Sequence, residues 1–471
     1  MKKFLYTLMA FVIFASMATG LTACKKTEQN EDPNAKPEFT IPAKGSPYAE
    51  GIQLPKLENT KVKILMGVNW DYIEKHNTEK EPYAQYHATK AWEATYGGSV
   101  EIETVADSAQ TEYLMTAMAS GTAPDLIPAG ETLYPLWSAN GLVANVEDVA
   151  DYLDLDDPIY KKDIMEQFKW LGKYQYIVTR EPAHYFVVYN KTKFNLAGEK
   201  TPMDYYKDGA WTWSQFVKTA RQMTTSDGSD YGFTGWGLFP YFAPYPMSQV
   251  QDDGTVKLTV DDPKYMAYMT EVYNFYQREQ AGRLDYSLQD WSKTFPQGTD
   301  AMVMTTVDNM KQIVNAAEEL ESDKFGIAPL PVFNLGEETE RISPATFWAY
   351  SISAGSKNPK GAATYIRLEA KVTENALKTM PEFGTLDDYL TEEEKTMIRT
   401  CNSEDKVLID PTRAIGDCYN IVDGELVPKL YYAVDLTSVQ ALIDSVKPKL
   451  QAEIDDFNEQ AQENQEAVSG E

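Results

Sequence analysis

An aromatic ring and a carboxylate follow the first predicted strand of the chain. Residues 62–68 (VKILMGV) favour a buried β-strand, and Trp70 and Asp71 come just after it. Aromatic rings pack on the C–H faces of sugars, and carboxylates accept hydrogen bonds from sugar hydroxyls. Because ligands collect beyond the carboxyl ends of strands in α/β sheets, we predict that Trp70 and Asp71 contact a ligand. The alternative is a turn that holds a half-buried Trp.

Catalytic chemistry finds less support in the sequence. Glycoside hydrolysis needs two carboxylates that flank the scissile bond, and among 71 acids some pair will always look suitable. The three histidines, His76, His87 and His184, form no H-E-x-x-H pattern, and neither a G-x-S-x-G nor a P-loop sequence occurs. No C-x-x-C or His-rich spacing indicates a metal. We therefore predict no enzyme, no cofactor and no metal centre.

The net charge argues against one class of partner. The chain carries 43 Lys and Arg against 71 Asp and Glu, a formal net charge of -28. Such a surface repels phosphate backbones, so we expect no nucleic-acid partner. We interpret the acidity as a means of staying soluble at a crowded cell surface. The alternative explanation is a cationic ligand.

The length and the alternation of patterns predict an α/β fold in two lobes. A chain of 471 residues exceeds what one hydrophobic core usually organises. Strand-like runs alternate with helical patterns, which is typical of largely parallel sheets. Strands are predicted at 62–68, 100–105, 124–127, 301–305, 325–328 and 349–353, and helices at 83–96, 113–119, 212–223, 359–368 and 439–457.

The first 24 residues have the pattern of a leader. Lys2 and Lys3 form a basic start, residues 4–19 are apolar, and Leu-Thr-Ala-Cys ends at Cys24. This resembles the bacterial lipobox, which implies a signal peptide at 1–23 and acyl chains such as palmitate on Cys24. More than one acyl chain would anchor the protein stably to the cell membrane, facing the extracytoplasmic side. The alternative is an uncleaved transmembrane anchor.

Both ends of the remaining chain have the composition of flexible segments. We predict a tether at residues 24–58, whose first part is rich in Lys, Glu, Asp, Asn and Pro, and a frayed tail at 459–471. Cys401 and Cys418 remain after Cys24 is assigned. They could form a disulfide in an exported chain or stay as two buried thiols, and the sequence leaves both open.

Six segments occur in the order found in a known family. They are 118–127 (MASGTAPDLI), 187–191 (VVYNK), 211–216 (WTWSQF), 231–233 (YGF) leading to Trp236, 295–302 (FPQGTDAM), and 325–331 (FGIAPLP) with 352–363. Between about residues 61 and 458 the chain resembles the family 1 extracellular solute-binding proteins, the maltose-binding-protein-like receptors of ABC importers.

The resemblance implies a two-lobed periplasmic-binding-protein-like fold of type II, with crossing hinge strands and C-terminal helices. We expect lobe 1 to comprise residues 59–183 and 297–333, and lobe 2 residues 184–296 and 334–458. The implied function is capture of a sugar or oligosaccharide in the cleft by hinge closure, and delivery to an ABC permease. We expect the receptor to be a monomer.

The resemblance also extends the set of candidate ligand contacts. It comprises Glu131 after the Pro-Asp strand, Tyr185 before the crossing strand with Arg180 nearby, Trp236 after Tyr-Gly-Phe, Asp308 after the Ala-Met strand, and Trp348 before the 349–353 strand. Asp308 and Asn309 stand where many relatives carry Gly and Trp, which could mark a different ligand. Trp211 and Trp213 start a helix in the matched motif, so we predict packing roles for them.

Three other functions stay open. A receptor for a non-carbohydrate solute would share the whole pattern. A surface enzyme that processes glycans would need a catalytic motif, and an adhesive lipoprotein would not need the lobe-crossing segments. The sequence does not give the ligand, its size, the affinity or the permease.

Overall fold

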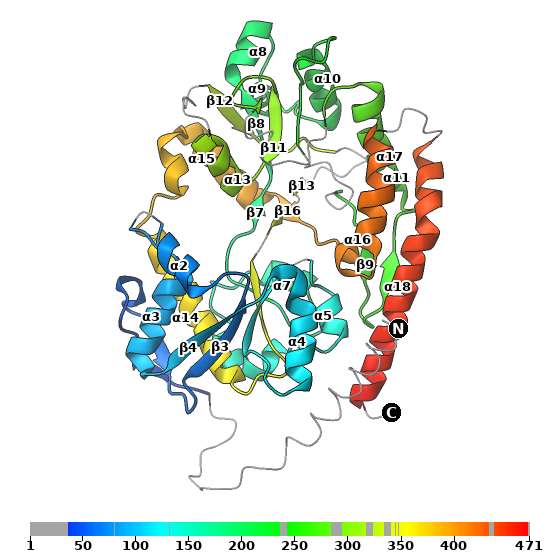
Figure 1. Cartoon of the computed structure of the whole chain (residues 1–471). Helices are drawn as coiled ribbons and strands as arrows, with labels where there is room; N and C mark the ends of the chain where they lie inside the picture. The colour runs from blue at the N-terminus through cyan, green and yellow to red at the C-terminus, as the bar shows by residue number, and fades with distance from the viewer. Residues whose placement is uncertain are drawn as a thin grey trace.

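The computed structural model describes residues 36–79, 81–130, 132–235, 243–283, 294–316, 324–333, 341–343, 345–346, 348–432 and 438–469. The chain forms two lobes joined by crossing segments, and a long C-terminal helix runs along one side of both (Figure 1). This is the two-lobed α/β arrangement that the sequence predicts. The leader and Cys24 lie outside the described residues.

The first lobe is built on a five-stranded sheet in the order β4-β3-β5-β15-β6. Its strands are β3 (Lys61–Met66), β4 (Ser99–Thr104), β5 (Leu126–Ala129), β6 (Ile177–Val178) and β15 (Ala349–Ile352). β3 is parallel to β4 and β5, whereas β15 is antiparallel to β5 and β6. The carboxyl ends of the three parallel strands therefore share one edge, which faces the other lobe (Figure 1).

Seven helices among the described residues belong to this lobe. They are α2 (Trp70–His76), α3 (Ala84–Tyr96), α4 (Gln110–Ala119), α5 (Leu136–Ala139), α6 (Ala150–Leu153), α7 (Lys162–Gln167) and α14 (Pro359–Leu377). α3 ends at Gly97 with φ 63°, the left-handed cap that the Gly97-Gly98 pair predicts. Short 3₁₀ turns, η2 (Pro47–Ala49), η3 (Asp107–Ala109) and η4 (Val146–Val149), complete it.

The second lobe holds a three-stranded sheet with β8 (Phe186–Asn190) between β11 (Met302–Thr305) and β12 (Phe325–Ala328), both antiparallel to β8. A separate hairpin is formed by β9 (Ser248–Val250) and β10 (Val256–Leu258). Its helices and turns are α8 (Lys191–Ala197), α9 (Pro202–Lys207), α10 (Trp213–Met223), α11 (Pro263–Tyr273), η6 (Asn274–Arg278), α13 (Val307–Ala316), η7 (Gly384–Asp388), α15 (Glu392–Glu404), η8 (Pro411–Ala414), α16 (Cys418–Ile421), η9 (Val422–Leu426), α17 (Val427–Tyr432) and α18 (Val439–Ser469).

Two short strand pairs lie where the chain crosses between the lobes. β7 (Ala183–His184) is antiparallel to β14 (Ala345–Thr346), and β13 (Ile342–Ser343) is parallel to β16 (Lys406–Val407). Few hydrogen bonds join each pair, so these crossings are the place where a small backbone change can rotate one lobe against the other.

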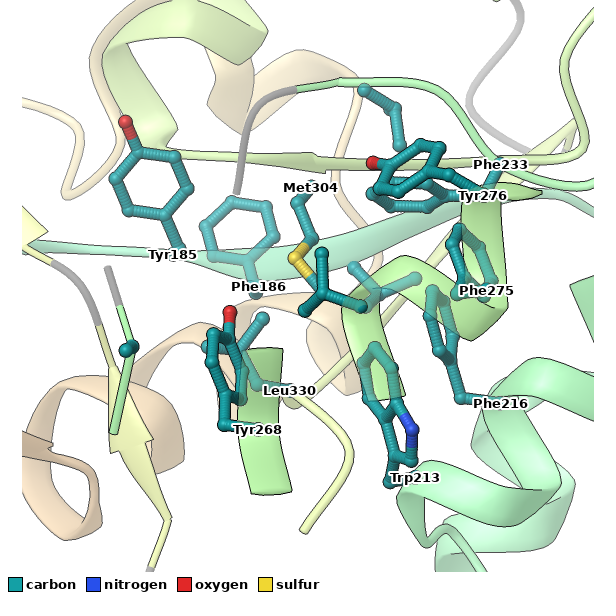
Figure 2. Close-up of a cluster of buried hydrophobic side chains, with 14 of the residues drawn as sticks. Tyr185, Phe186, Trp213, Phe216, Phe233, Tyr268, Phe275, Tyr276, Met304 and Leu330 are labelled. Carbon is teal, nitrogen blue, oxygen red and sulfur yellow. The ribbon is translucent and has the colours of Figure 1, made fainter. Parts of the chain in front are cut away.

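Each lobe has its own hydrophobic core. In the second lobe, aromatic rings gather between α10, η6 and the sheet, as Figure 2 shows for Phe216, Phe233 and Phe275. The Phe216 and Phe275 rings stack with centroids 5.3 Å apart, and Phe233 meets Phe275 edge-on at 5.7 Å. α10 begins after Thr212, whose hydroxyl accepts a hydrogen bond from the Gln215 backbone N–H. The Gln215 side chain donates to Thr219 rather than closing a capping box.

The sheet pairings correct the expected division into lobes. We expected 297–333 in lobe 1, but β11 and β12 flank β8 and so belong to lobe 2. We expected all of 334–458 in lobe 2, but β15 pairs with β5 and β6, and α14 packs on α3 in lobe 1. Non-consecutive strands pair in both sheets, which local patterns do not reveal.

The expected flexible ends are also shorter than predicted. β1 (Phe39–Pro42) pairs with β2 (Gln53–Pro55), and Ala49 and Leu54 are fully buried in the lobe-1 core. At the other end, α18 continues to Ser469, and Ala461 is only 2% exposed. Both segments carry enough apolar side chains at the right spacing to fold onto the lobes. No helix within the described ranges is long and apolar enough to cross a membrane.

Candidate functional site

Trp348 stands at the carboxyl edge of the lobe-1 sheet with 70% of its surface exposed. The next residue, Ala349, pairs with Ala129 at the end of β5 and with Val178 in β6. Trp348 therefore lies where the chain leaves the crossing segment and enters the sheet. A Trp ring this exposed at a sheet edge presents a flat apolar face that a ligand can cover.

Asp71 and Trp70 lie in the first turn of α2, at the end of β3. Asn69 caps the helix by accepting a hydrogen bond from the Tyr72 N–H at 2.9 Å. The Trp70 ring stacks on Tyr86 of α3, with centroids 5.6 Å apart, and the Lys90 ammonium lies 5.1 Å from the Trp70 ring centre. Trp70 is thus half-buried against α3, whereas the Asp71 side chain is exposed.

Tyr72 was not among the residues that the sequence singled out. Its ring is 44% exposed and stacks on His76 one turn later, at 3.8 Å between centroids. Its position, two residues after Trp70 at the end of a strand, is the sequence feature that could have identified it. α2 therefore holds one aromatic ring against α3 and leaves a second partly exposed to solvent.

Tyr185 and Arg180 flank the crossing strand β7. Tyr185 is 7% exposed, and its backbone N–H donates to the Ser343 hydroxyl in β13 at 3.0 Å. Arg180 donates to the Glu369 carboxylate of α14 at 2.6 Å. Burial opposes the charge of Arg180, but the neighbouring carboxylate outweighs it and raises the pKa of the guanidinium. These contacts hold Arg180 and Tyr185 in place on either side of β7.

Asp308 is exposed in the first turn of α13, at the edge of lobe 2 that faces lobe 1. β11 ends at Thr305, which pairs with Phe186 just after the crossing, and α13 follows. The Asp308 carboxylate accepts from the Lys311 ammonium at 3.2 Å. The Asn309 N–H donates to the Thr306 hydroxyl. The structure thus brings Asp308, Trp348 and Asp71 to the facing edges of the two lobes.

Three candidates, Glu131, Trp236 and Cys24, lie outside the described residues. The packing roles predicted for Trp211 and Trp213 are confirmed, since they are 4% and 7% exposed. Their indole N–H groups donate to the Pro329 carbonyl at 2.8 Å and to the Glu271 carboxylate at 3.2 Å. Among the described side chains, no group of three or more His, Cys, Asp and Glu could hold a metal ion.

The Pro-Asp motif has a structural role. One Asp125 oxygen accepts from the Lys63 N–H of β3 at 2.9 Å, and the other accepts from the Ser356 hydroxyl at 2.7 Å and the Asn358 N–H at 3.1 Å. Asn358 then caps α14. One buried carboxylate therefore joins the end of β15 and the start of α14 to the central sheet.

Cys401 and Cys418 are both free and buried. Burial raises the pKa of both thiols, that of Cys418 to about 12. The disulfide that the sequence left open is absent between these two residues.

Comparison with known proteins agrees with this architecture. Residues 75–376 match the family model of the bacterial extracellular solute-binding proteins, and the chain belongs to this family. No curated protein matches the chain.

Solved structures of such proteins share the fold. An ABC substrate-binding protein from Listeria monocytogenes in complex with cycloalternan matches with a TM-score of 0.57 at 15% identity, over 84% of this chain and 99% of that one. An extracellular solute-binding protein from Staphylococcus aureus in complex with maltose gives 0.61 at 13% identity, over 85% and 99%. UgpB from Mycobacterium tuberculosis in complex with glycerophosphocholine gives 0.59 at 14%, over 84% and 98%.

Proposed function

We propose that this solute-binding protein captures a sugar or oligosaccharide between its lobes and delivers it to an ABC permease. The ligand would lie against Trp348 on lobe 1 and meet carboxylates from both lobes as they close. Closure gives the permease two distinguishable shapes, empty and loaded.

The observation that carries the proposal is the exposure of Trp348. Burying a Trp is favourable, so a ring that is 70% exposed at the entrance to a sheet costs free energy unless a ligand covers it. Sugars offer C–H faces that fit such a ring, and their hydroxyls need acceptors. Asp71 and Asp308 supply exposed carboxylates on the two facing edges.

The remaining predicted contacts have secondary roles in this proposal. Tyr185 lies at the hinge and would line the floor of the cleft. Glu131 directly follows Gly130 at the end of β5, and Trp236 follows Gly235 in lobe 2, so both are candidates for further contacts. Trp70 would act by supporting α2, because its ring is engaged with Tyr86.

We also propose that the protein works at the outer face of the cell membrane, held by acyl chains on Cys24. The leader and the cysteine that ends it support this proposal. Residues 25–35 would link the anchor to β1. Growth in radiolabelled palmitate tests it, since label should enter the wild type and not a Cys24→Ala variant.

The test of ligand class is a thermal-shift screen of residues 25–471 against sugars, oligosaccharides, polyols, glycerophosphodiesters, peptides and amino acids. A ligand that binds only the folded state stabilises it by RT ln(1 + [L]/Kd), so a micromolar binder at millimolar concentration raises the melting temperature visibly. A shift with one sugar class and no product formed supports the proposal. A shift only with a glycerophosphodiester or another solute would replace the sugar, and turnover would point to an enzyme.

A further inference from the structure

A groove of about 620 Å³ follows α10 in lobe 2. One wall is α10 itself, and the other is formed by the end of α11 and by the residue that follows η6. Beneath the groove these helices pack through aromatic rings, since Phe216 and Phe275 stack with centroids 5.3 Å apart. Figure 1 shows α10 near the end of lobe 2 that is remote from lobe 1. The groove is therefore separate from the facing edges of the lobes.

The floor of the groove is apolar. Val217 of α10 lines it together with Phe333, which follows β12. The centroid of the Phe333 ring lies 5.2 Å from that of Trp213 and 5.2 Å from that of Tyr268, and Phe333 remains partly exposed. The Trp213 backbone N–H donates to the Val332 carbonyl at 2.9 Å and so fixes the segment that carries Phe333 against the start of α10. The floor is thus preformed and can accept an apolar side chain of a ligand.

The two walls of the groove carry opposite charges. Lys218 and Arg221 are exposed about one turn apart on α10, and Glu271 and Glu279 line the opposite wall. None of these four side chains forms an ion pair with a residue that the structure describes. The Trp213 indole N–H donates to the Glu271 carboxylate at 3.2 Å and holds it beside the floor. The groove therefore keeps two cations and two carboxylates apart although their charges attract.

The basic wall contrasts with the charge of the whole chain. The formal net charge is -28, yet α10 carries Lys218 and Arg221 and no acidic residue. Such a wall favours a carboxylate, and the acidic wall opposite it favours an ammonium group. A ligand that carries both groups complements the groove, whereas a neutral sugar would match neither wall.

The distance between the charges fits a short peptide. Glu271 lies beside Trp213 at the start of α10, and the Thr224 hydroxyl at the end of α10 donates to the Ala281 carbonyl at 3.1 Å, so the two walls run in the same direction. Trp213 and Arg221 are separated by eight residues of helix, which is about 12 Å. Four residues of extended chain span about 13 Å.

We propose that this groove, which we call the α10 groove, binds a short peptide with free termini in an extended conformation. The peptide ammonium pairs with Glu271, and the peptide carboxylate pairs with Lys218 and Arg221. An apolar side chain of the peptide lies on Val217 and Phe333. The α10 groove is then a second binding site, and the inference does not depend on the proposed capture of a sugar. Exposed ion pairs contribute little each, so we expect a Kd on the order of 0.1 to 1 mM.

Saturation-transfer NMR with the peptide Ala-Leu-Leu-Ala tests the proposal, because the only charges of this peptide are its termini. We expect saturation transfer to the free peptide and almost none to the same peptide with acetylated and amidated ends. Equal transfer to both peptides, or none to the free peptide, would overturn the proposal.

Two variants of different kinds locate the peptide. Lys218→Glu reverses a charge of the basic wall and should weaken binding about threefold to tenfold. Val217→Trp fills the floor and should weaken binding with all four charges in place. Lys257→Glu is the matched control, since Lys257 is exposed on β10 and does not line the groove. Melting temperatures establish that each variant is folded.

Trp348→Ala separates the α10 groove from the proposed sugar site. We expect this variant to bind Ala-Leu-Leu-Ala as the wild type does. Loss of peptide binding in Trp348→Ala, with binding kept in Lys218→Glu, would place the peptide between the lobes and overturn the inference. The sugar screen decides the proposed function independently, because peptide binding in the α10 groove is expected whether or not a sugar binds.

Discussion

Glu369 of α14 accepts a hydrogen bond from Arg180 at 2.6 Å, and the two residues tie the longest helix of lobe 1 to the point where the chain leaves β6 for the hinge. The Glu369 side chain is fully buried, and Arg180 is about one-third exposed. Lobe 2 has a counterpart, since Arg341 before β13 donates to the buried Asp405 before β16 at 2.5 Å. Each lobe thus carries an Arg–carboxylate pair with a fully buried carboxylate next to the crossing strands.

Removing Arg180 should destabilise lobe 1 because it leaves a buried carboxylate without its cation. For Arg180→Ala we expect the free energy of unfolding in urea to fall by about 3 kcal/mol. The matched control is Lys200→Ala, which breaks the pair with Asp208 at a similar distance of 2.8 Å but with both side chains more than half exposed. That change should cost less than about 0.5 kcal/mol. Equal losses of unfolding free energy in the two variants would show that the buried Arg180–Glu369 pair contributes no more than the exposed pair.

Because of Asp410, the free energy of unfolding should fall as the pH rises from about 4 to about 6. Its burial raises the pKa to about 6 from 3.8, although the backbone N–H groups of Met247 and Thr412 donate to it. Between these two pKa values the folded protein keeps a proton on Asp410 that the unfolded chain releases. The contribution of this proton to the free energy of unfolding is therefore present below pH 4 and lost by pH 6. Its size is on the order of 3 kcal/mol.

The comparison of wild type with Asp410→Asn isolates this effect, because Asn cannot titrate. Urea unfolding at pH 4, 5, 6 and 7 should show the wild type losing stability relative to the variant as the pH rises. Parallel curves across this range would show that Asp410 titrates near its ordinary pKa.

The two thiols of residues 25–471 should be unreactive in the folded protein and reactive after unfolding. Cys401 and Cys418 are free and buried, and burial raises the pKa of both thiols, so little thiolate exists at neutral pH. Titration with a thiol reagent should find almost no reactive thiol in buffer and two reactive thiols in guanidinium chloride. Finding none in either condition would mean a disulfide.

Local signals predicted most helices and strands correctly. Gly97 ends α3 and Thr212 caps α10 as their residue types indicate, because capping depends only on neighbours in the sequence. The division into lobes depends on which strands pair. β8 pairs with β11 and β12, and β15 pairs with β5, all far apart along the chain. No local pattern records such partners, so this part of the prediction failed.

The positions of the candidate contacts, though not their role, could be predicted in part, again from local signals. Strand ends indicated where ligand contacts should gather, and Trp348, Asp71 and Asp308 lie at the facing edges of the lobes. The direction of a side chain depends on tertiary neighbours, and Trp70 turned toward Tyr86 rather than outward. Composition misjudged residues 39–55, where a few apolar side chains such as Leu54 are enough to anchor a polar segment.

Trp348→Ala should weaken ligand binding while leaving the fold intact. The ring is 70% exposed, so its loss should change the free energy of unfolding by less than about 0.5 kcal/mol. Loss of the stacking face should weaken binding of the sugar found in the thermal-shift screen by at least about tenfold, and Trp348→Phe should lose less. Isothermal titration calorimetry measures the affinities.

Leu196→Ala is the matched control for this prediction, since Leu196 is 84% exposed on α8, away from the facing edges of the lobes. It should bind the sugar as the wild type does. If Trp348→Ala also binds normally, the ligand does not cover this ring, and the aromatic contact must come from another residue such as Tyr72 or Trp236. If binding and stability fall together, Trp348 supports the sheet edge rather than the ligand.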